Sequence, residues 1–143
     1  MRKFVLDTNI VLAYIRQNPQ YLEAESRLNL TSDDAQLIVS VVTIGEIRVL
    51  ARRNDWGEKK MEQLNSFIEQ VLFVVDVNSG APELLDAYVE IDCFSNNRSM
   101  GKNDLWIAAT AMVTESTLVT TDGDFDHLGG VYFQLANIPN PSF

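Results

Sequence analysis

The sequence predicts an α/β fold of three layers, in which a central, mostly parallel sheet lies between two layers of helices. Short apolar runs alternate along the chain with segments of helical periodicity. This alternation is typical of parallel βαβ units, whose connecting helices cover both faces of the sheet. The run at 36–42 is apolar and rich in β-branched residues, as expected of a strand that is covered on both faces.

The first half of the chain contains two predicted strands. An apolar run at 3–6 ends at an acidic turn and predicts the first strand. Asn18 and Pro19 begin a helix that extends through Leu30, because Asn is a favourable N-cap and Pro suits the first helical position. The other expected elements are a helix at 10–16, a polar turn at 31–35, the strand at 36–42, a helix from Thr43 to about Arg53, and a helix at 58–70.

The second half contains three more predicted strands. In order, the expected elements are a strand at 72–77, a helix at 82–91, a loop at 93–103, a helix from Asp104 to about Glu115, a strand at 117–120, a turn-rich connection at 122–130, a short strand at 131–133, and an irregular tail with Pro139 and Pro141. No linker or repeat interrupts this pattern, so one domain spanning 1–143 is expected.

Composition narrows the possible functions. The chain has 11 Lys+Arg against 20 Asp+Glu, a formal net charge of −9, so any contact with nucleic acid must be local rather than through bulk electrostatics. The single cysteine, Cys93, can form no disulfide within the chain. The basic N-terminus lacks the features of a signal peptide, and no segment is apolar enough to span a bilayer. We therefore expect a cytoplasmic protein without membrane contact.

Acidic residues stand at predicted strand ends and at a helix start. Asp7 directly follows the first strand, Glu46 lies in the first turn after the second, and Asp122 lies just past the fourth. The carboxyl ends of parallel strands share one edge of the sheet, where ligands bind. Asp104 opens the helix before the fourth strand, and Asp124 is a further candidate.

Carboxylates that converge repel one another, and a divalent cation removes that conflict. Oxygen ligands without Cys or His favour Mg²⁺, Mn²⁺ or Ca²⁺ over Zn²⁺, and the only histidine, His127, cannot build a histidine site. Such a cation can activate water and stabilise charge on a phosphoryl oxygen, which suffices for phosphodiester hydrolysis.

Each acid also has a purely structural interpretation. Thr43 and Glu46 fit a capping box. Asp7 and Asp104 are suitable helix caps, and Asp122 fits a plain turn. For each acid alone the alternatives stay open, and the shared sheet edge is what favours a functional site.

Four short motifs carry these acids. They are V-L-D-T-N-I at 5–10, T-I-G-E-I at 43–47, N-D-L-W-I-A-A-T-A at 103–111, and L-V-T-T-D-G-D-F at 118–125. In the order and spacing of these motifs, and in total length, nearly the whole chain resembles the PIN domain family, particularly the VapC-like toxins of bacterial toxin–antitoxin pairs.

The resemblance implies a PIN-like α/β/α fold and Mg²⁺-dependent endoribonuclease activity, with Mn²⁺ as a substitute cation. It matches Asp7, Asp104 and Asp122 to ligands of the principal cation. Glu46 would hold a second cation or orient the attacking water, and Asp124 becomes a secondary acid. The resemblance further implies that carboxylates or water are oriented by polar residues beside the acids, namely Thr8, Asn9 and Thr120.

The resemblance also implies partners. Similar toxins are blocked by a cognate antitoxin whose C-terminal segment covers the acidic pocket, and this chain's negative charge is compatible with that. Homodimers are common in the family, and the apolar residues of the second and fourth predicted helices could serve one. Candidate RNA phosphate contacts are the basic residues near the acids, namely Arg48, Arg52, Arg53, Lys59, Lys60, Arg98 and Lys102.

Four other interpretations of these residues are possible. The basic residues could simply form solvated helix faces that contact no RNA. Trp106 and the segment 107–111 fit a helix packed in the core better than a surface that stacks on bases. A receiver-type signalling module needs an aspartate after a central strand, where Thr43 stands, and a haloacid dehalogenase-type phosphatase needs one where Asn9 stands. The stronger rival is a PIN-fold RNA-binding or interaction module without turnover, against which the intact set of acids counts.

Overall fold

The sheet is wholly parallel in the residues that the computed structural model describes, which are 1–96 and 98–139. Its strand order is β3-β2-β1-β4-β5. The strands are β1 (Arg2–Leu6), β2 (Ala35–Ser40), β3 (Leu72–Val75), β4 (Thr117–Thr120) and β5 (Leu135–Asn137). The predicted α/β class with a mostly parallel sheet is confirmed.

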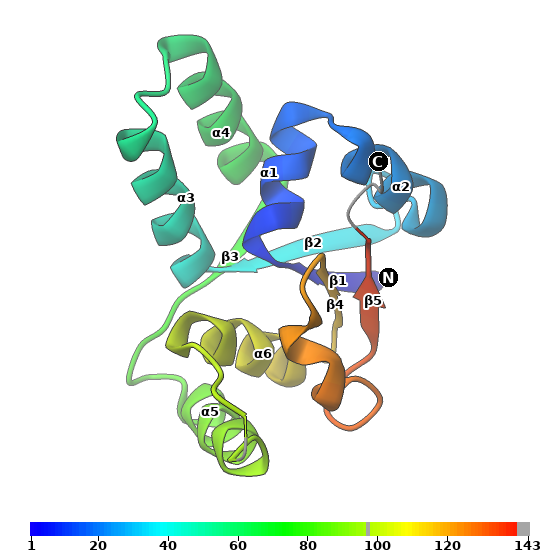
Figure 1. Cartoon of the computed structure of the whole chain (residues 1–143), viewed down its shortest axis with the longest axis vertical. Helices are drawn as coiled ribbons and strands as arrows, with labels where there is room; N and C mark the ends of the chain where they lie inside the picture. The colour runs from blue at the N-terminus through cyan, green and yellow to red at the C-terminus, as the bar shows by residue number, and fades with distance from the viewer. Residues whose placement is uncertain (97, 140–143) are drawn as a thin grey trace.

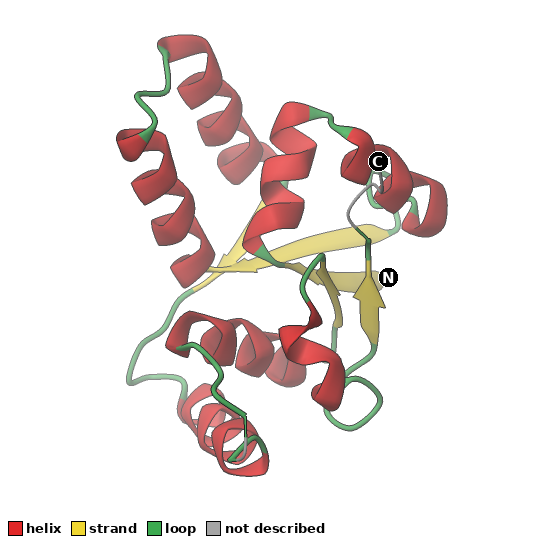
Figure 2. Ribbon diagram, in the orientation of Figure 1, coloured by secondary structure: helices red, strands yellow, loops and turns green. Residues whose placement is uncertain are grey.

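Helices cover both faces of this sheet and complete the three predicted layers (Figure 1). One layer contains α1 (Thr8–Arg16), α2 (Pro19–Leu28), α3 (Val41–Arg53) and α4 (Glu58–Gln70). The other contains α5 (Pro82–Phe94), α6 (Lys102–Thr114) and the 3₁₀ helix η1 (Gly123–Leu128). In Figure 2 the yellow strands run between these two groups of red helices.

The central strand β1 shows why both faces need cover. Phe4 and Leu6 pack in the core cluster beneath α1 to α4, whereas Val5 between them packs in the cluster formed with α5 and α6. Successive side chains of a strand point to opposite faces, so an apolar strand supplies both cores. In β4, Val119 and Leu118 divide between the two clusters in the same way.

The junction of β2 and α3 differs from the prediction. The strand ends at Ser40 and the helix begins at Val41, two residues before the predicted start at Thr43. The Ser40 hydroxyl accepts a hydrogen bond from the backbone N–H of Val42 at 3.1 Å and so caps the helix. Thr43 is fully buried inside α3, and its Oγ1 has no hydrogen-bond partner among the described residues. The capping box of Thr43 and Glu46 was therefore wrong.

The last strand was also misplaced. The segment 131–133 is apolar and aromatic, which favours a strand, but β5 lies at Leu135–Asn137. The N–H groups of Val131 and Tyr132 instead donate to the carbonyl of Leu128, which closes a turn after η1. Phe133 is 7% exposed and fills the core beside α5 and α6. Burial of Phe133, rather than sheet pairing, accounts for the aromatic end of this segment, whereas Val131 is 56% exposed.

Other element ends shifted by a few residues. Helix α5 extends to Phe94, so Cys93 lies in it and not in the predicted loop. Helix α6 begins at Lys102, and strand β3 ends at Val75. Pro139 follows β5 outside any element, whereas Pro141 lies outside the described residues.

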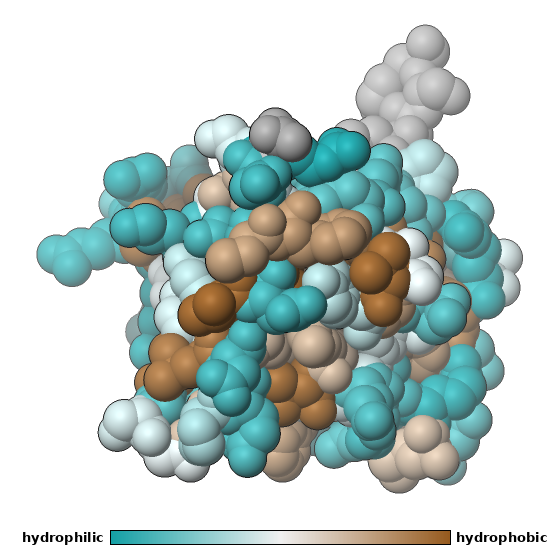
Figure 3. Space-filling view, turned by 90° about the horizontal axis from the view of Figure 1, so that it is seen from below, coloured by the Kyte–Doolittle hydropathy of each residue, from teal (hydrophilic) through white to brown (hydrophobic). Residues whose placement is uncertain are grey.

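The outer side of α5 carries apolar side chains. Leu85, Val89 and Phe94 are 45%, 59% and 48% exposed. Seen from below, this side of the molecule shows hydrophobic patches among hydrophilic ones (Figure 3). Of the helices described, none combines the length and the apolar character needed to cross a bilayer.

Stability measurements can test which residue caps the start of α3. We expect Ser40→Ala to lower the free energy of unfolding by about 1 kcal/mol, because it removes the helix cap. We expect Thr43→Val to leave it unchanged or raise it by up to ~1 kcal/mol, because the buried hydroxyl has no partner to lose. Urea unfolding of both variants measures the two values, and the opposite ranking would support the capping box.

Candidate active site

The candidate site lies beyond the carboxyl ends of the neighbouring strands β1 and β4, where the order in which the chain adds strands to the sheet reverses. From β1 the sheet grows through β2 and β3 to one edge and through β4 and β5 to the other. The crevice beyond the carboxyl ends of two such neighbouring strands is the usual ligand site of an open α/β sheet. Asp7 follows β1 and Asp122 lies two residues beyond β4, so these acids flank the crevice as predicted.

Asp7 is held from two sides. It is 6% exposed, and its Oδ1 accepts from the N–H of Thr8 at 2.7 Å as the N-cap of α1. Its Oδ2 accepts from the hydroxyl of Thr120 at 2.7 Å. Burial raises the pKa of Asp7, although both hydrogen bonds oppose the rise. The Asp7 side chain therefore caps α1 and also belongs to the candidate site.

Glu46 lies in the second turn of α3 and cannot cap it, because the helix already begins at Val41. Its Oε1 accepts a hydrogen bond of 2.9 Å from the hydroxyl of Thr8. That contact joins the starts of α1 and α3, two elements that follow neighbouring strands. Thr8 and Thr120 thus each donate a hydrogen bond to a carboxylate, as expected of residues that orient the acids.

Asp104 reaches the same crevice from α6, which runs from the carboxyl-end edge of the sheet back towards the start of β4. Carboxylate oxygens of Asp104, Asp122 and Asp124 lie within 4.8 Å of one another. Burial and the negative charges of the surrounding acids, with Asp7 first, raise the pKa of Asp104 to about 7. The pKa of Asp124 is raised chiefly by the charge of Asp122.

The loop after β4 is fixed by side chains from three elements. The Asp122 N–H donates to the Thr120 hydroxyl at 3.0 Å, and Asn137 of β5 donates to the Asp122 carbonyl at 3.0 Å. Asn9 donates to the hydroxyl of Thr121 at 3.2 Å. Asn137 was missed from the sequence because the last strand was predicted four residues too early.

A cavity of about 430 Å³ collects the predicted acids. Asp7, Glu46, Asp104 and Asp122 all line it, and Asp124 stands beside it through its contact with Asp104 and Asp122. The remaining lining residues are Thr8, Asn9, Val49, Leu50, Arg53 and Asn103. Asn103 was not singled out from the sequence, although it stands next to Asp104 in one of the four motifs.

The predicted basic residues separate in the structure. Arg53 lines the acidic cavity, two helical turns after Glu46 on the same face of α3, and Lys102 lines an adjoining hollow beside Asp104. Arg48 and Arg52 line neither hollow, because helical spacing places them on another side of α3. Lys60, in α4, lies over the ring of Trp56, with 4.1 Å between its Nζ and the ring centroid.

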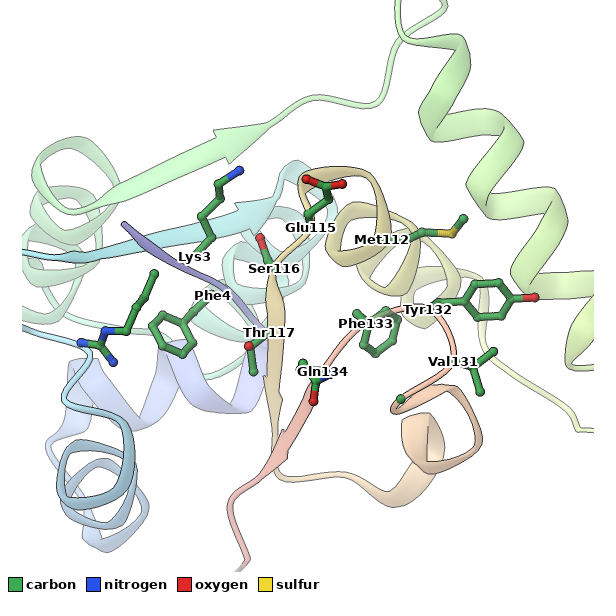
Figure 4. Close-up of a pocket in the computed structure, with 12 residues that line it drawn as sticks. Lys3, Phe4, Met112, Glu115, Ser116, Thr117, Val131, Tyr132, Phe133 and Gln134 are labelled. Atoms are coloured by element: carbon green, nitrogen blue, oxygen red, sulfur yellow. The ribbon is translucent and has the colours of Figure 1, made fainter.

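A larger hollow of about 740 Å³ lies at the other end of the sheet, by the starts of β1 and β4. Figure 4 shows Lys3 and Glu115 at its edge and the aromatic side chains of Phe4, Tyr132 and Phe133 in its lining, to which Arg2 adds a third charged group. It contains no converging set of acids. We therefore place the chemistry in the smaller acidic cavity.

Comparison with known proteins agrees with this architecture. The sequence model of the PIN domain family matches residues 4–131, which is most of the chain. The chain belongs to the PIN domain family. This membership confirms the resemblance seen in the four motifs.

Individual PIN domain proteins resemble the chain along most of its length. Ribonuclease VapC2 of Haemophilus influenzae is 27% identical over 122 residues, which cover 85% of this chain and 88% of the relative. The tRNA(fMet)-specific endonuclease VapC of Shigella flexneri is 25% identical over 132 residues, covering 92% and 96%.

Solved structures share the fold. VapBC-1 of nontypeable Haemophilus influenzae matches with a TM-score of 0.74 and 25% identity, covering 94% of this chain and 97% of that one. VapBC2 of Rickettsia felis, bound to a DNA fragment from its promoter, matches with a TM-score of 0.76 and 23% identity, covering 94% and 98%.

The donor set of this PIN domain suits a hard divalent cation. The clustered side chains of Asp104, Asp122 and Asp124 offer only oxygen atoms. Without a cation, burial and the neighbouring carboxylates raise the pKa of Asp104 to about 7, so this acid is partly protonated near neutral pH. A cation of charge +2 would relieve both the repulsion and the burial of charge.

The pKa of Asp104 predicts an unusual pH dependence. The pKa is about 7 in the folded chain against 3.8 in the unfolded one, so the folded state binds the proton more tightly. The free energy of unfolding of the metal-free protein therefore falls as the pH rises from about 4 to about 7. In EDTA, Asp104→Asn should be more stable than the wild type at pH 8, and the difference should shrink towards pH 4.

Urea unfolding at several pH values measures this difference. Asp86→Asn, which removes an exposed carboxylate on α5, is the charge-matched control and should show no such trend. A stability difference between Asp104→Asn and the wild type that stays constant with pH would contradict the account of the acidic cavity.

Proposed function

We propose that this chain is a metal-dependent endoribonuclease of the VapC type, the toxin of a toxin–antitoxin pair, which hydrolyses RNA phosphodiester bonds. The observation that carries the proposal is the meeting of Asp7, Glu46, Asp104 and Asp122 in one cavity at the switch point of the sheet. The ribonuclease names of the relatives at 25–28% identity support it.

In this proposal Asp7, Asp104 and Asp122 hold the principal cation, Mg²⁺ or in its place Mn²⁺. Asp124 is a further acidic ligand, and Glu46 holds a second cation or orients the attacking water. A bound divalent cation supplies a water of lowered pKa and stabilises charge on the phosphoryl oxygens. Oxygen-only ligands with no His or Cys support Mg²⁺ and Mn²⁺ over Zn²⁺.

The other polar residues position these acids. Thr120 fixes one oxygen of Asp7 and the backbone of Asp122, so one buried hydroxyl sets the spacing of two ligands. Thr8 holds Glu46 at the opposite wall of the cavity. With their orientation fixed in advance, the carboxylates need little rearrangement when substrate and cation arrive.

We further propose that the chain acts as a single domain in the cytoplasm, where an antitoxin covers the acidic cavity. A homodimer would have to use surfaces other than the predicted face of α4, because Leu64 is fully buried and Met61, Phe67 and Ile68 pack against the core of the same chain. On α2, Leu22 remains 62% exposed. The rival without turnover, an RNA-binding or interaction module, leaves the clustered carboxylates without a role.

Cleavage of RNA tests the proposal. With Mg²⁺ or Mn²⁺ the wild type should cut at least one RNA in a panel of tRNA, rRNA and mRNA. Addition of EDTA should abolish the cutting. Asp104→Asn should lower kcat at least ~100-fold, about 2.7 kcal/mol in activation free energy, because a ligand of the cation is lost.

Asp86→Asn is again the matched control and should cut at the wild-type rate. A folded, metal-loaded protein that binds RNA but cuts none of the panel would favour the module without turnover. Cutting that persists in EDTA would contradict the metal-dependent site.

The two adjacent arginines at the end of α3 give a matched pair for RNA binding. Arg53→Gln should weaken RNA binding and lower the salt slope by ~0.7, because Arg53 lines the acidic cavity. Arg52→Gln removes the same charge from another side of the helix and should change binding less. Fluorescence anisotropy in an Asp104→Asn background measures both, and equal effects would argue against a contact specific to the cavity.

A further inference from the structure

A separate hollow of about 300 Å³ lies between the end of α5 and η1. Its lining consists of Phe94, Ser95, Asn96, Arg98 and His127. None of the acids assigned to the active site contributes to it. Both segments that build it nevertheless lead directly to those acids, which makes it a neighbour of the active site along the chain.

His127 is fixed in this hollow by a buried hydroxyl. Ser95 is 2% exposed, and its Oγ lies 2.7 Å from Nε2 of His127. The backbone N–H of Ser95 donates to carbonyls of α5, and its carbonyl accepts from the N–H of Arg98. This arrangement locks one ring nitrogen and leaves Nδ1 without a hydrogen-bond partner among the described residues.

Arg98 supplies an unpaired positive charge. The ion pair found among the described residues joins Arg2 to Asp34, so no described carboxylate lies within 4.0 Å of the Arg98 guanidinium. Burial and then the charge of Arg98 lower the pKa of His127, and the opposing effect of Asp126 is smaller. Burial and the nearby positive charge both disfavour the protonated ring.

An exposed aromatic ring completes the hollow. Phe94 is 48% exposed and lies parallel to the His127 ring, with centroids 6.3 Å apart and an interplanar angle of 5°. It also packs nearly perpendicular to the ring of Tyr132, with a centroid distance of 5.3 Å. An aromatic ring that is held by such contacts and is still about half exposed is suited to stacking with a nucleobase.

The two segments tie the hollow to the catalytic acids. His127 lies three positions after Asp124 in η1, which is ~6 Å along a 3₁₀ helix. The connection that begins at Ser95 and includes Arg98 ends at Lys102, beside Asp104. On a chain of net charge −9, an anionic substrate entering the acidic cavity needs an anchor of this kind nearby.

We propose that Arg98, His127 and Phe94 form an RNA subsite beside the active site, which holds a phosphate and a base next to the bond that is cut. Arg98 pairs with the phosphate through its planar fork of N–H groups. The Ser95 hydroxyl can either donate to Nε2 or accept from it; in the tautomer in which it donates, His127 carries its proton on Nδ1 and can donate it to a phosphate oxygen. Phe94 offers its open face to the base. The proposal rests on the ribonuclease function proposed above.

Three variants test the subsite. Arg98→Gln removes the phosphate fork. His127→Gln removes the ring and the Nδ1 donor and keeps an amide that can still reach Ser95. Lys3→Gln is the control, because it removes one positive charge as Arg98→Gln does, but at the opposite end of the sheet. Thermal unfolding checks that each variant folds.

The readouts are KM and kcat for an RNA that the wild type cuts, and the salt dependence of binding to a labelled single-stranded RNA in an Asp104→Asn background. We expect Arg98→Gln and His127→Gln to raise KM about fivefold or more with kcat within about twofold of the wild type. Arg98→Gln should also lower the salt slope by ~0.7, whereas Lys3→Gln should match the wild type.

Two results would overturn the subsite while leaving the ribonuclease in place. One is a KM for both variants equal to that of Lys3→Gln. The other is a loss of kcat at unchanged KM, which would show that the Ser95 contact only supports η1 and its acids. A wild type that neither binds nor cuts any RNA would contradict the proposed function and the subsite together.

Discussion

Mutual repulsion among carboxylates is the constraint around which this molecule is built. A parallel sheet brings the ends of β1 and β4 side by side, and this chain places an acid after each of them and two more on flanking helices. Burial of such charges costs free energy, which the raised pKa of Asp104 and of Asp7 records. The fold must therefore supply enough packing elsewhere to hold the cluster together.

Two features meet that requirement. The apolar strands feed two separate cores, one under α1 to α4 and one under α5, α6 and η1, so the sheet is clamped from both faces. Short hydrogen bonds from Thr8 and Thr120 then fix the carboxylates without adding charge. Phe125 is fully buried one residue after Asp124 and anchors the loop that carries two of the acids. The geometry of the site is thus a consequence of the packing beneath it.

Most of this could be predicted from the sequence, because the relevant signals are local. Apolar runs mark the strands, and acids placed directly after them must meet at one edge. Asp104 was harder to place, since its position depends on α5 and α6 turning back across the sheet. The segment 131–133 was mistaken for a strand because apolar and aromatic residues occur in turns as well as in strands, and here only Phe133 is buried. Ser40 and Thr43 both offer a hydroxyl near the helix start, and only the backbone geometry decides between them.

Other features depend on contacts between distant residues. Ser95 and His127 are 32 residues apart, and nothing in their local sequence indicates that they meet. By contrast, the separation of Arg53 from Arg48 and Arg52 was available from helical spacing relative to Glu46. Spacing on a helix would have distinguished the arginine that lines the cavity from the two that do not.

Anomalous diffraction from crystals soaked in Mn²⁺ would show directly whether the acidic cavity holds a divalent cation. We expect an anomalous peak in contact with the carboxylates of Asp104 and Asp122, and its loss in crystals of Asp104→Asn. A fully occupied Mn²⁺ elsewhere on the molecule, with none in this cavity, would show that these acids do not form the cation site.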